Sequence, residues 1–344
     1  MGVQNVKWFE SYLQHRKQIV AVKQSLSNAN TVTYGVPQGS ILGPLLFLCY
    51  MNDMELCISK DSQLLLYADD SVIMYSSKDP KDIKTKLTAE LQSCKTWLIN
   101  NKLSLHLGKT ECIIFGTKQK LREISNFQIE LDGHVIQAQD KVKYLGVEID
   151  QTLSGTYIVD NIVKKVNNKL RFLYRQCKSF PCDIKRTLCI ALVMCHFDYC
   201  CAAWYHGLSK NMTEKLQVAQ NKCIRFIKGM ASREPVTGPI HKELKILNVE
   251  KRVKQMTLNH MFNIYYQTAP KYLSDKLTRV NSRHDHATRN STLNFNRLSS
   301  KGQMMKTFSY NGVIIWNELP ADVKQSSHKP HFKYHLEQFL FNDI

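Results

Sequence analysis

The chain has 344 residues, 43% of them hydrophobic, and a formal net charge of +18. No uninterrupted apolar run reaches the roughly 18 residues of a membrane span, and the first residues lack the apolar core of a signal peptide. On sequence grounds these features exclude a secreted or membrane-integral protein. They predict an intracellular protein, in the nucleus or the cytoplasm, with no membrane partner.

The positive charge is concentrated in the second part of the chain. Residues 1–150 hold 17 basic and 16 acidic residues, whereas residues 151–344 hold 30 and 13. Such an uneven distribution predicts a polyanionic partner, and nucleic acid is the commonest one. The alternative is a basic surface that serves only solubility.

The 11 cysteines are typical of a reducing compartment, because they are scattered through apolar stretches and form no spaced framework. The densest group lies between Cys177 and Cys201, close to His196 and His206, and contains no CxxC pair. Zinc binding is one interpretation of this group, and buried helical thiols are the other.

Residues 1–150 combine helical and strand patterns. In chain order we expect an amphipathic helix running into a strand at residues 8–22, an interrupted strand TVTYGVPQGS at 31–40, an apolar helix from 41 with Ser40 as N-cap, a strand pair at 64–75, a helix starting at Pro80, a strand TECIIFG at 110–116, a hairpin turning at Asp132 and Gly133, and a strand KVKYLGVEID at 141–150. This part is therefore predicted to be α+β, with a mainly antiparallel sheet covered by helices.

After Asp150 the pattern becomes helical. Residues 161–176 and 213–230 carry apolar residues at steps of three and four, with basic residues on the other face. Residues 274–303 are polar and rich in Ser, Asn and Arg, which predicts a loop or an arm.

Two adjacent aspartates, Asp69 and Asp70, interrupt the apolar stretch LLLYADDSVIMY. Ionised carboxylates inside apolar strands are costly unless they are compensated, and a divalent cation would compensate them. The alternative is an ordinary turn, where Asp is common.

Four motifs appear in one order with characteristic spacing. They are GVPQGSILGPLLFLCYMND (35–53), LLLYADDSVIMY (64–75), WLINNKLSLHLGKTECIIFG (97–116) and KYLGVEID (143–150). In this order they resemble the reverse transcriptases of non-LTR retrotransposons of the jockey and chicken-repeat type. Nearly the whole chain is covered, because QNKCIRFIKG, APKYLSDKL and FSYNGVIIWNELP resemble the region that follows the polymerase in those elements.

The resemblance implies an RNA-directed DNA polymerase with an RNA template, a DNA primer and deoxynucleoside triphosphates as partners. It implies a partial palm over residues 1–150, a helical basic thumb over 151–230 and a basic C-terminal extension over 231–344. Asp69 and Asp70 would hold Mg²⁺, or Mn²⁺, for two-metal nucleotidyl transfer to the primer 3′-hydroxyl.

Further roles follow from the same resemblance. Gln38, Gly39 and Tyr67 would bind the substrate and primer end, with Gly39 leaving room for what lies over it. Lys109 would approach the triphosphate as a catalytic residue, the alternative being a solvated turn lysine. Tyr144, Leu145 and Gly146 would form the primer grip, the alternative being a plain hydrophobic hairpin.

Basic side chains of the second part are predicted to hold the phosphates of template and primer. These are Lys222, Arg225, Lys228, Arg279, Arg283 and Arg289.

A two-metal site needs a third carboxylate, which the family supplies in an AFDxV motif upstream of the helix that here contains Trp8. That motif is not found, and the nearest acidic residues, Glu10, Asp53 and Glu55, are predicted to lie in unsuitable elements. We therefore expect an N-terminally truncated polymerase, and we expect the polymerase activity of this chain by itself to be impaired. The alternatives are a catalytically inactive nucleic-acid-binding remnant and a structural or interaction protein.

Overall fold

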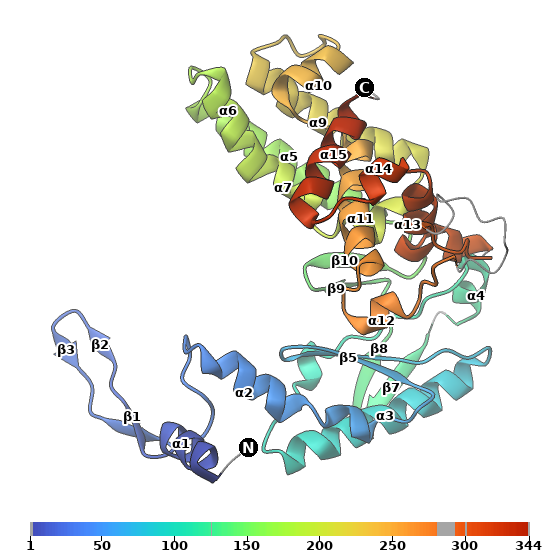
Figure 1. Cartoon of the computed structure of the whole chain (residues 1–344). Helices are drawn as coiled ribbons and strands as arrows, with labels where there is room; N and C mark the ends of the chain where they lie inside the picture. Colours follow the sequence, from blue (N-terminus) through green and yellow to red (C-terminus); the bar gives the residue numbers. More distant parts are fainter. Residues whose placement is uncertain (1–2, 125, 281–292, 300, 343–344) are drawn as a thin grey trace. The chain divides into compact units, whose positions relative to one another are not determined.

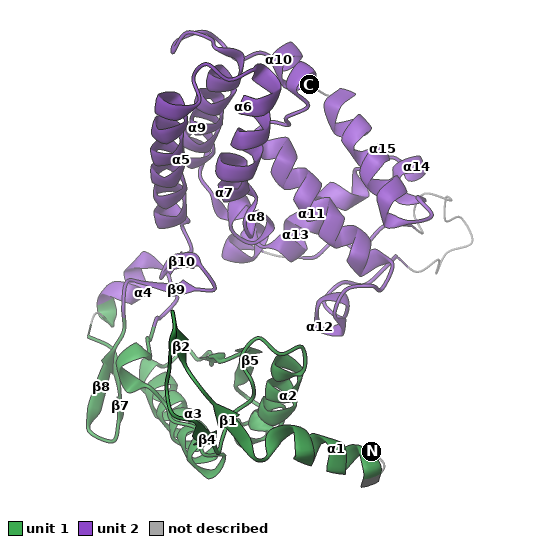
Figure 2. Ribbon diagram, turned by 90° about the vertical axis from the view of Figure 1, so that its left-hand side faces the viewer, with its two compact units in different colours: residues 1–112, 123–138 green, residues 113–122, 139–344 purple. Residues whose placement is uncertain are grey.

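The computed structural model describes residues 3–124, 126–280, 293–299 and 301–342 (Figure 1). The chain forms two compact units, which Figure 2 shows in different colours. Unit 1 contains residues 1–112 and 123–138, and unit 2 contains residues 113–122 and 139–344. These units are defined by packing, and the functional boundaries predicted at residues 150 and 230 remain predictions.

Unit 1 is built from helices and two-stranded ladders. Its helices are α1 (Val3–Leu13), α2 (Leu42–Met51) and α3 (Pro80–Asn100), with 3₁₀ turns η1 (Met54–Cys57) and η2 (Leu107–Lys109). Its strands are β1 (Arg16–Gln18), β2 (Ala21–Val22), β3 (Ser25–Leu26), β4 (Asn30–Val32), β5 (Gln63–Tyr67), β6 (Asp70–Met74), β7 (Gln128–Leu131) and β8 (His134–Gln137).

The predicted α+β class and the antiparallel pairing are confirmed, but the expectation of one sheet is wrong. Within the described residues the strands pair only two by two, as β1 with β4, β2 with β3, β5 with β6 and β7 with β8. The predicted strand at 110–116 is also wrong, because its one ladder contact is an isolated bridge between Cys112 and Ala138. Because each of these strands has only one partner among the described residues, the ladders do not join into a common sheet.

The helix predicted from Pro80 is confirmed as α3. Asp79 caps it by accepting a 2.9 Å hydrogen bond from the backbone N–H of Lys81, and Pro80 occupies the first turn, where its missing N–H costs nothing. Cys94 of α3 packs against Met51 of α2 and Met54 of η1. This small core supports one face of unit 1.

Unit 2 is mainly helical, as predicted. Its helices are α4 (Lys118–Glu123), α5 (Thr156–Gln176), α6 (Cys182–Cys189), α7 (Cys195–Asp198), α8 (Cys201–Trp204), α9 (Lys210–Lys228), α10 (Gly238–Leu244), α11 (Val249–Tyr265), α12 (Lys271–Ser274), α13 (Phe308–Asn317), α14 (Ala321–Lys324) and α15 (Lys329–Asn342). Shorter turns are η3 (Ile190–Met194), η4 (Tyr205–Gly207) and η6 (Gly302–Lys306), and the strands β9 (Lys141–Tyr144) and β10 (Val147–Asp150) form a hairpin.

Two apolar clusters form the interior of unit 2. The first joins α5 and α9, which lie side by side in Figure 2, through Val166, Leu170 and Leu216. The second surrounds Trp316 of α13, whose side chain is fully buried and stacks on Tyr265 of α11 with ring centroids 5.2 Å apart. The helical periodicity read from the sequence therefore corresponds to real core faces.

One stretch of unit 2 differs from the expectation that no segment could span a membrane. Cys182–Gly207 is long enough and, with a mean hydropathy of 1.5, apolar enough. Val193 and Phe197 within it are buried in the first cluster, and a π-turn at η3 and the left-handed Cys200, φ +50°, interrupt its helical course. A core helix meets the same criteria, so this stretch is weak evidence for a span. The absence of a membrane partner stays a prediction.

Candidate active site

The two aspartates lie at the tip of the β5–β6 hairpin. Tyr67 pairs with Asp70, which leaves Ala68 and Asp69 as the two-residue turn. Ala68 has φ +52°, a left-handed conformation that costs a non-glycine residue about 1 kcal/mol. At the base of the hairpin, Leu64 and Ile73 pair directly and pack against the core formed by α2, η1 and α3. The base of the hairpin is thus fixed by packing against this core, and the tip projects from it.

Both carboxylates are exposed at the hairpin tip. Among the described residues neither side chain has an ion pair or a hydrogen bond. Glu90 of unit 1 provides the contrast: it is 4% exposed and accepts hydrogen bonds from Ser59 and Ser62. Burial raises the pKa of Glu90, but these hydrogen bonds outweigh burial and the pKa is lowered. The aspartates at the tip have no such internal role.

The donor set of the tip suits Mg²⁺. Mg²⁺ prefers carboxylate oxygens and is commonly held by one or two carboxylates together with water and substrate phosphates. Over the part of the chain that the structure describes, no group of three or more His, Cys, Asp or Glu side chains could hold a metal. Among the described residues, Glu10, Asp53 and Glu55 form no such group with the pair, and the zinc interpretation of the cysteine group finds no support there.

The other substrate residues predicted in unit 1 are exposed. Tyr67 is the last residue of β5, and Lys109 ends η2. Gln38 and Gly39 form a turn before α2. Gly39 has φ +80°, and a Cβ built on it would meet no atom within 4 Å. Within this chain the glycine is therefore required by its backbone conformation, not by close approach of another part of the protein.

The predicted primer grip is the turn of the β9–β10 hairpin in unit 2. Leu145 and Gly146 have φ +44° and +80°, the signs of a type I′ turn. The hydroxyl of Tyr199, which follows α7, donates a 2.6 Å hydrogen bond to the carbonyl of Leu145, and a Cβ on Gly146 would lie 3.4 Å from the same hydroxyl. Sequence reasoning missed Tyr199, because no local pattern links positions 54 residues apart.

Asp150 connects this hairpin to α5. Asp150 is 6% exposed, and its carboxylate accepts hydrogen bonds from Thr152, Ser154 and the backbone N–H of Gly155. Burial raises the pKa of Asp150, but these hydrogen bonds outweigh burial and the pKa is lowered. The sequence signal is the run D-x-T-x-S-G, in which short polar side chains bond nearby backbone groups.

We expect Asp150→Asn to destabilise unit 2 by about 1–3 kcal/mol, because an amide cannot accept all of these charge-assisted bonds. A carboxyl group whose folded pKa is depressed stabilises the fold above its unfolded pKa and loses that contribution as the pH falls through the folded pKa. The free energy of urea unfolding of the natural chain should therefore fall more than that of the variant as the pH drops below about 5. Asp140→Asn, at an exposed position, is the control, and equal pH profiles for the natural chain and Asp150→Asn would contradict this role.

The predicted phosphate-binding cations of unit 2 make internal contacts. Lys222 donates to Asn167 at 3.2 Å, Arg225 donates to the carbonyl of Glu234 at 2.7 Å, and Lys228 pairs with Glu243 at 2.7 Å. Arg279 lies over the ring of Tyr265, 4.3 Å from its centroid, and donates to the Tyr265 carbonyl. Arg283 and Arg289 lie outside the described residues. The phosphate-binding role of all six remains a prediction.

Further exposed cations lie on α5. Lys164, Arg171 and Arg175 lie at i, i+7 and i+11, on the helix face opposite the buried Val166 and Leu170. Among the described residues none of the three has an ion pair or a hydrogen bond from its side chain. Their periodicity was visible in the sequence, but their freedom from internal partners was not.

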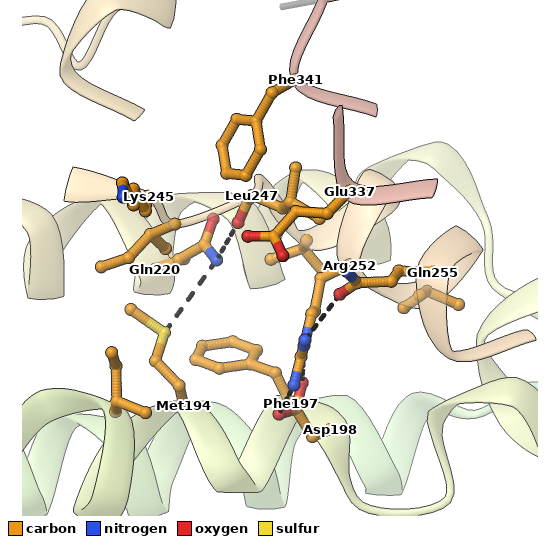
Figure 3. A pocket seen from close by; sticks show the side chains of 14 residues that line it. Met194, Phe197, Asp198, Gln220, Lys245, Leu247, Arg252, Gln255, Glu337 and Phe341 are labelled. Carbon is orange, nitrogen blue, oxygen red and sulfur yellow. Dashed lines mark hydrogen bonds and ion pairs between the residues drawn. The ribbon is translucent and has the colours of Figure 1, made fainter. Parts of the chain in front are cut away.

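A cavity of about 180 Å³ in unit 2 is lined by apolar side chains and a few polar ones (Figure 3). Arg252 forms a bidentate ion pair with Asp198, at 2.8 and 2.7 Å, and also donates to Gln255. Hydrogen bonding of the Arg252 guanidinium to the Asp198 carboxylate is the main cause of the raised pKa of Arg252. The cavity is smaller than the roughly 300–1,000 Å³ of typical ligand pockets, and none of the predicted site residues lines it.

The comparisons with known proteins agree with the motifs. Residues 1–149 match the family model described as reverse transcriptase (RNA-dependent DNA polymerase). The chain is 26% identical over 266 residues to the probable RNA-directed DNA polymerase from transposon BS of Drosophila melanogaster, covering 72% of this chain and 28% of that protein. It is 25% identical over 264 residues to the RNA-directed DNA polymerase from mobile element jockey of the same organism, covering 73% and 28%.

A third relative, the probable RNA-directed DNA polymerase from transposon X-element of Drosophila melanogaster, is 25% identical over 246 residues, covering 70% of this chain and 26% of that protein. The chain thus spans about a quarter of the length of the curated relatives it matches. The family match begins at residue 1, includes α1 and the β5–β6 hairpin, and ends in β10. Residues 1–149 are therefore similar to the reverse transcriptase family, and the chain as a whole is similar to the jockey-like polymerases of non-LTR transposons.

Proposed function

We propose that this chain contributes the metal-binding hairpin and primer-positioning elements of an RNA-directed DNA polymerase that extends a DNA primer on an RNA template. The observation that carries this proposal is the Asp69–Asp70 tip of an anchored hairpin with a left-handed Ala68, where both carboxylates are exposed and have no side-chain partner among the described residues. A strained backbone conformation at a polar tip is common at functional sites. An intracellular location, in the nucleus or the cytoplasm, belongs to the same proposal.

In the proposed reaction Asp69 supplies carboxylate oxygens to Mg²⁺, or Mn²⁺, and Asp70 adds negative charge beside it. A bound ion of this kind lowers the barrier to attack by the primer 3′-hydroxyl and neutralises the charge of the departing pyrophosphate. Because both carboxylates are exposed and bound to no other side chain of the described protein, they require no rearrangement to serve as ligands. Unit 1 would thus be a partial polymerase palm.

The remaining residues of unit 1 have roles around this tip in our proposal. Gln38 and Gly39 contact the incoming deoxynucleotide, and Tyr67, next to the turn, contacts the primer end. Lys109 donates a proton to the pyrophosphate, for which an exposed ammonium is suitable. The exposed positions of all four are compatible with contact to a ligand.

In unit 2 we propose that the turn Tyr144–Gly146 positions the primer. Its support is the hydrogen bond from Tyr199 to the Leu145 carbonyl, which restrains the turn, and the Asp150 network, which connects the hairpin to α5. A restrained turn is what positioning requires, because small displacements of reacting groups are costly in rate.

A second candidate function is nucleic-acid binding without catalysis. It is favoured by the lack of a group of three metal-binding side chains among the described residues and by the basic excess of the second part of the chain. The free cations of α5 would carry binding in either case. A purely structural or interaction protein is the third hypothesis, in which the basic face meets a protein.

The deciding experiment is primer extension with Mg²⁺ on an RNA template annealed to a DNA primer, together with RNA binding at low salt. We expect RNA binding by the full chain, together with template-dependent extension that is weak because no third carboxylate joins Asp69 and Asp70 among the described residues. RNA binding without extension would overturn the polymerase proposal in favour of the binding remnant. Loss of RNA binding even at 50 mM salt would overturn both, because phosphate contacts are strongest at low salt.

A further inference from the structure

Three histidines gather at the start of α15, far along the chain from the polymerase motifs. His328 precedes the helix, and His331 and His335 lie within its first two turns. The proposed polymerase function uses none of them. Imidazole is the commonest side-chain ligand of zinc, copper and nickel, so a group of three on one surface raises the question of metal binding.

His331 and His335 are one helical turn apart and point at each other. Their Nε2 atoms are 2.9 Å apart, and their ring centroids are 4.2 Å apart. A spacing of i, i+4 places both side chains on the same face of a helix. The ring of His328 lies 5.7 Å from that of His331, with the two planes inclined by 25°.

The separation of the two Nε2 atoms is close to what a shared metal ion needs. Zinc binds histidine nitrogen at about 2.0–2.1 Å, so two nitrogens on one tetrahedral ion lie about 3.3 Å apart. The pair would have to open by only a few tenths of an ångström from its present 2.9 Å. Without metal, one imidazole donates its N–H to the other; with metal, both Nε2 lone pairs face the ion and each ring carries its proton on Nδ1.

The surroundings of the pair are rigid and open to solvent. On the adjacent face of α15, Phe332 and Leu336 are fully buried, and Phe332 stacks on Phe262 of α11 at 4.4 Å. This packing holds the helix and hence the spacing of the two imidazoles. His331 is exposed and His335 is half-buried, so an ion reaches them directly.

His328 has a contact typical of a metal ligand's second nitrogen. Its Nδ1 lies 2.7 Å from the hydroxyl of Ser327. Metal-binding histidines generally use their other ring nitrogen in such a hydrogen bond, which leaves Nε2 for the ion. As the described side chains stand, three of them do not converge on one point. His328 would therefore join only after its side chain rotates, and water would complete the shell until then.

We propose that His331 and His335 form a two-point binding site for a transition-metal dication, Zn²⁺ or a neighbouring ion of the same preference, with His328 as a third ligand. The histidine site belongs to unit 2, whereas the Asp69–Asp70 tip belongs to unit 1. The two sites also differ in ligand type, since nitrogen ligands select zinc-like ions and oxygen ligands select Mg²⁺. Binding across one turn would stabilise the start of α15 on unit 2.

The test is Zn²⁺ binding to the full chain, measured by competition with a chelating dye under reducing conditions. His331→Gln and His335→Gln are expected to lose one equivalent of Zn²⁺ relative to the natural chain. His134→Gln, which removes an exposed histidine on β8, is the matched control and should lose none. Because the chain has 11 cysteines that also bind zinc, the difference between chains is the quantity compared.

A second readout separates metal binding from a folding defect. Zn²⁺ should raise the unfolding temperature of the natural chain and of His134→Gln, and this rise should be reduced in both α15 variants. Without metal, circular dichroism of all four chains should agree, since the substituted side chains lie outside the core. Equal zinc equivalents in all chains, or an unfolding temperature that rises equally in all, would overturn the proposal.

Discussion

Replacing Asp69 with asparagine is expected to reduce Mg²⁺-dependent primer extension by about 10²-fold or more, because one preorganised charge at a reacting centre typically contributes about 10² to 10³ in rate. Asparagine preserves the shape of the side chain and is well tolerated in turns, so the β5–β6 hairpin should keep its register. The loss would then report the charge and not the fold. The measurement is extension of a DNA primer on an RNA template over a range of Mg²⁺ concentrations.

Asp61→Asn is the matched control for this variant. Asp61 also lies in unit 1, its side chain is 80% exposed, and its Oδ2 is 3.9 Å from the ammonium of Lys86, a distance typical of weak surface pairs. We expect unchanged extension for this control. If Asp69→Asn and Asp61→Asn extended the primer equally well, the metal-ligand role of Asp69 would be wrong even though the chain is active.

The second large effect is expected on α5. Changing Lys164, Arg171 and Arg175 together to glutamine should weaken RNA binding and lower the slope of log affinity against log salt by about 2 to 3, since each phosphate contact contributes about 0.7 to 0.9. All three side chains are exposed, and within the described chain none has an ion pair, so folding should not change. Titration of a labelled RNA between 50 and 200 mM salt measures the slope.

The control for this prediction also tests three of the phosphate-binding residues that were predicted from the sequence. Lys222, Arg225 and Lys228 contact Asn167, Glu234 and Glu243, respectively. Changing these three to glutamine should alter the salt slope less than the α5 variant does, because their cations already have protein partners. A larger effect from this triple than from the α5 triple would restore the sequence-based choice and contradict ours.

Much of the local structure could be predicted, because its causes are local. The hydrophobic periodicity of α3, α5 and α9 reports which face of a helix is buried, and Asp79–Pro80 marks a helix start through hydrogen bonding within one turn. The Asp132–Gly133 turn was found for the same reason: both residues have positive φ, at +50° and +77°, which such a hairpin requires.

The strands were predicted less well. TECIIFG has the composition of a strand, but a strand needs a partner that its own residues do not specify, and only the bridge from Cys112 to Ala138 forms. The apolar run around Asp69 likewise indicated burial, whereas Leu65 and Leu66 are 45% and 38% exposed in a two-stranded ladder. Burial depends on what packs against the strand.

By itself, the sequence indicated the resemblance to reverse transcriptases and the residues predicted to bind metal, because these follow from the order and spacing of GVPQGS, YADD, LGKTE and KYLG along the chain. Tertiary structure alone decided which cations have partners among the described residues and what restrains the turn at Leu145 and Gly146. Lys222 meets Asn167 across 55 positions and Tyr199 meets Leu145 across 54. Contacts over such separations depend on how helices pack in unit 2, which no local pattern of residues encodes.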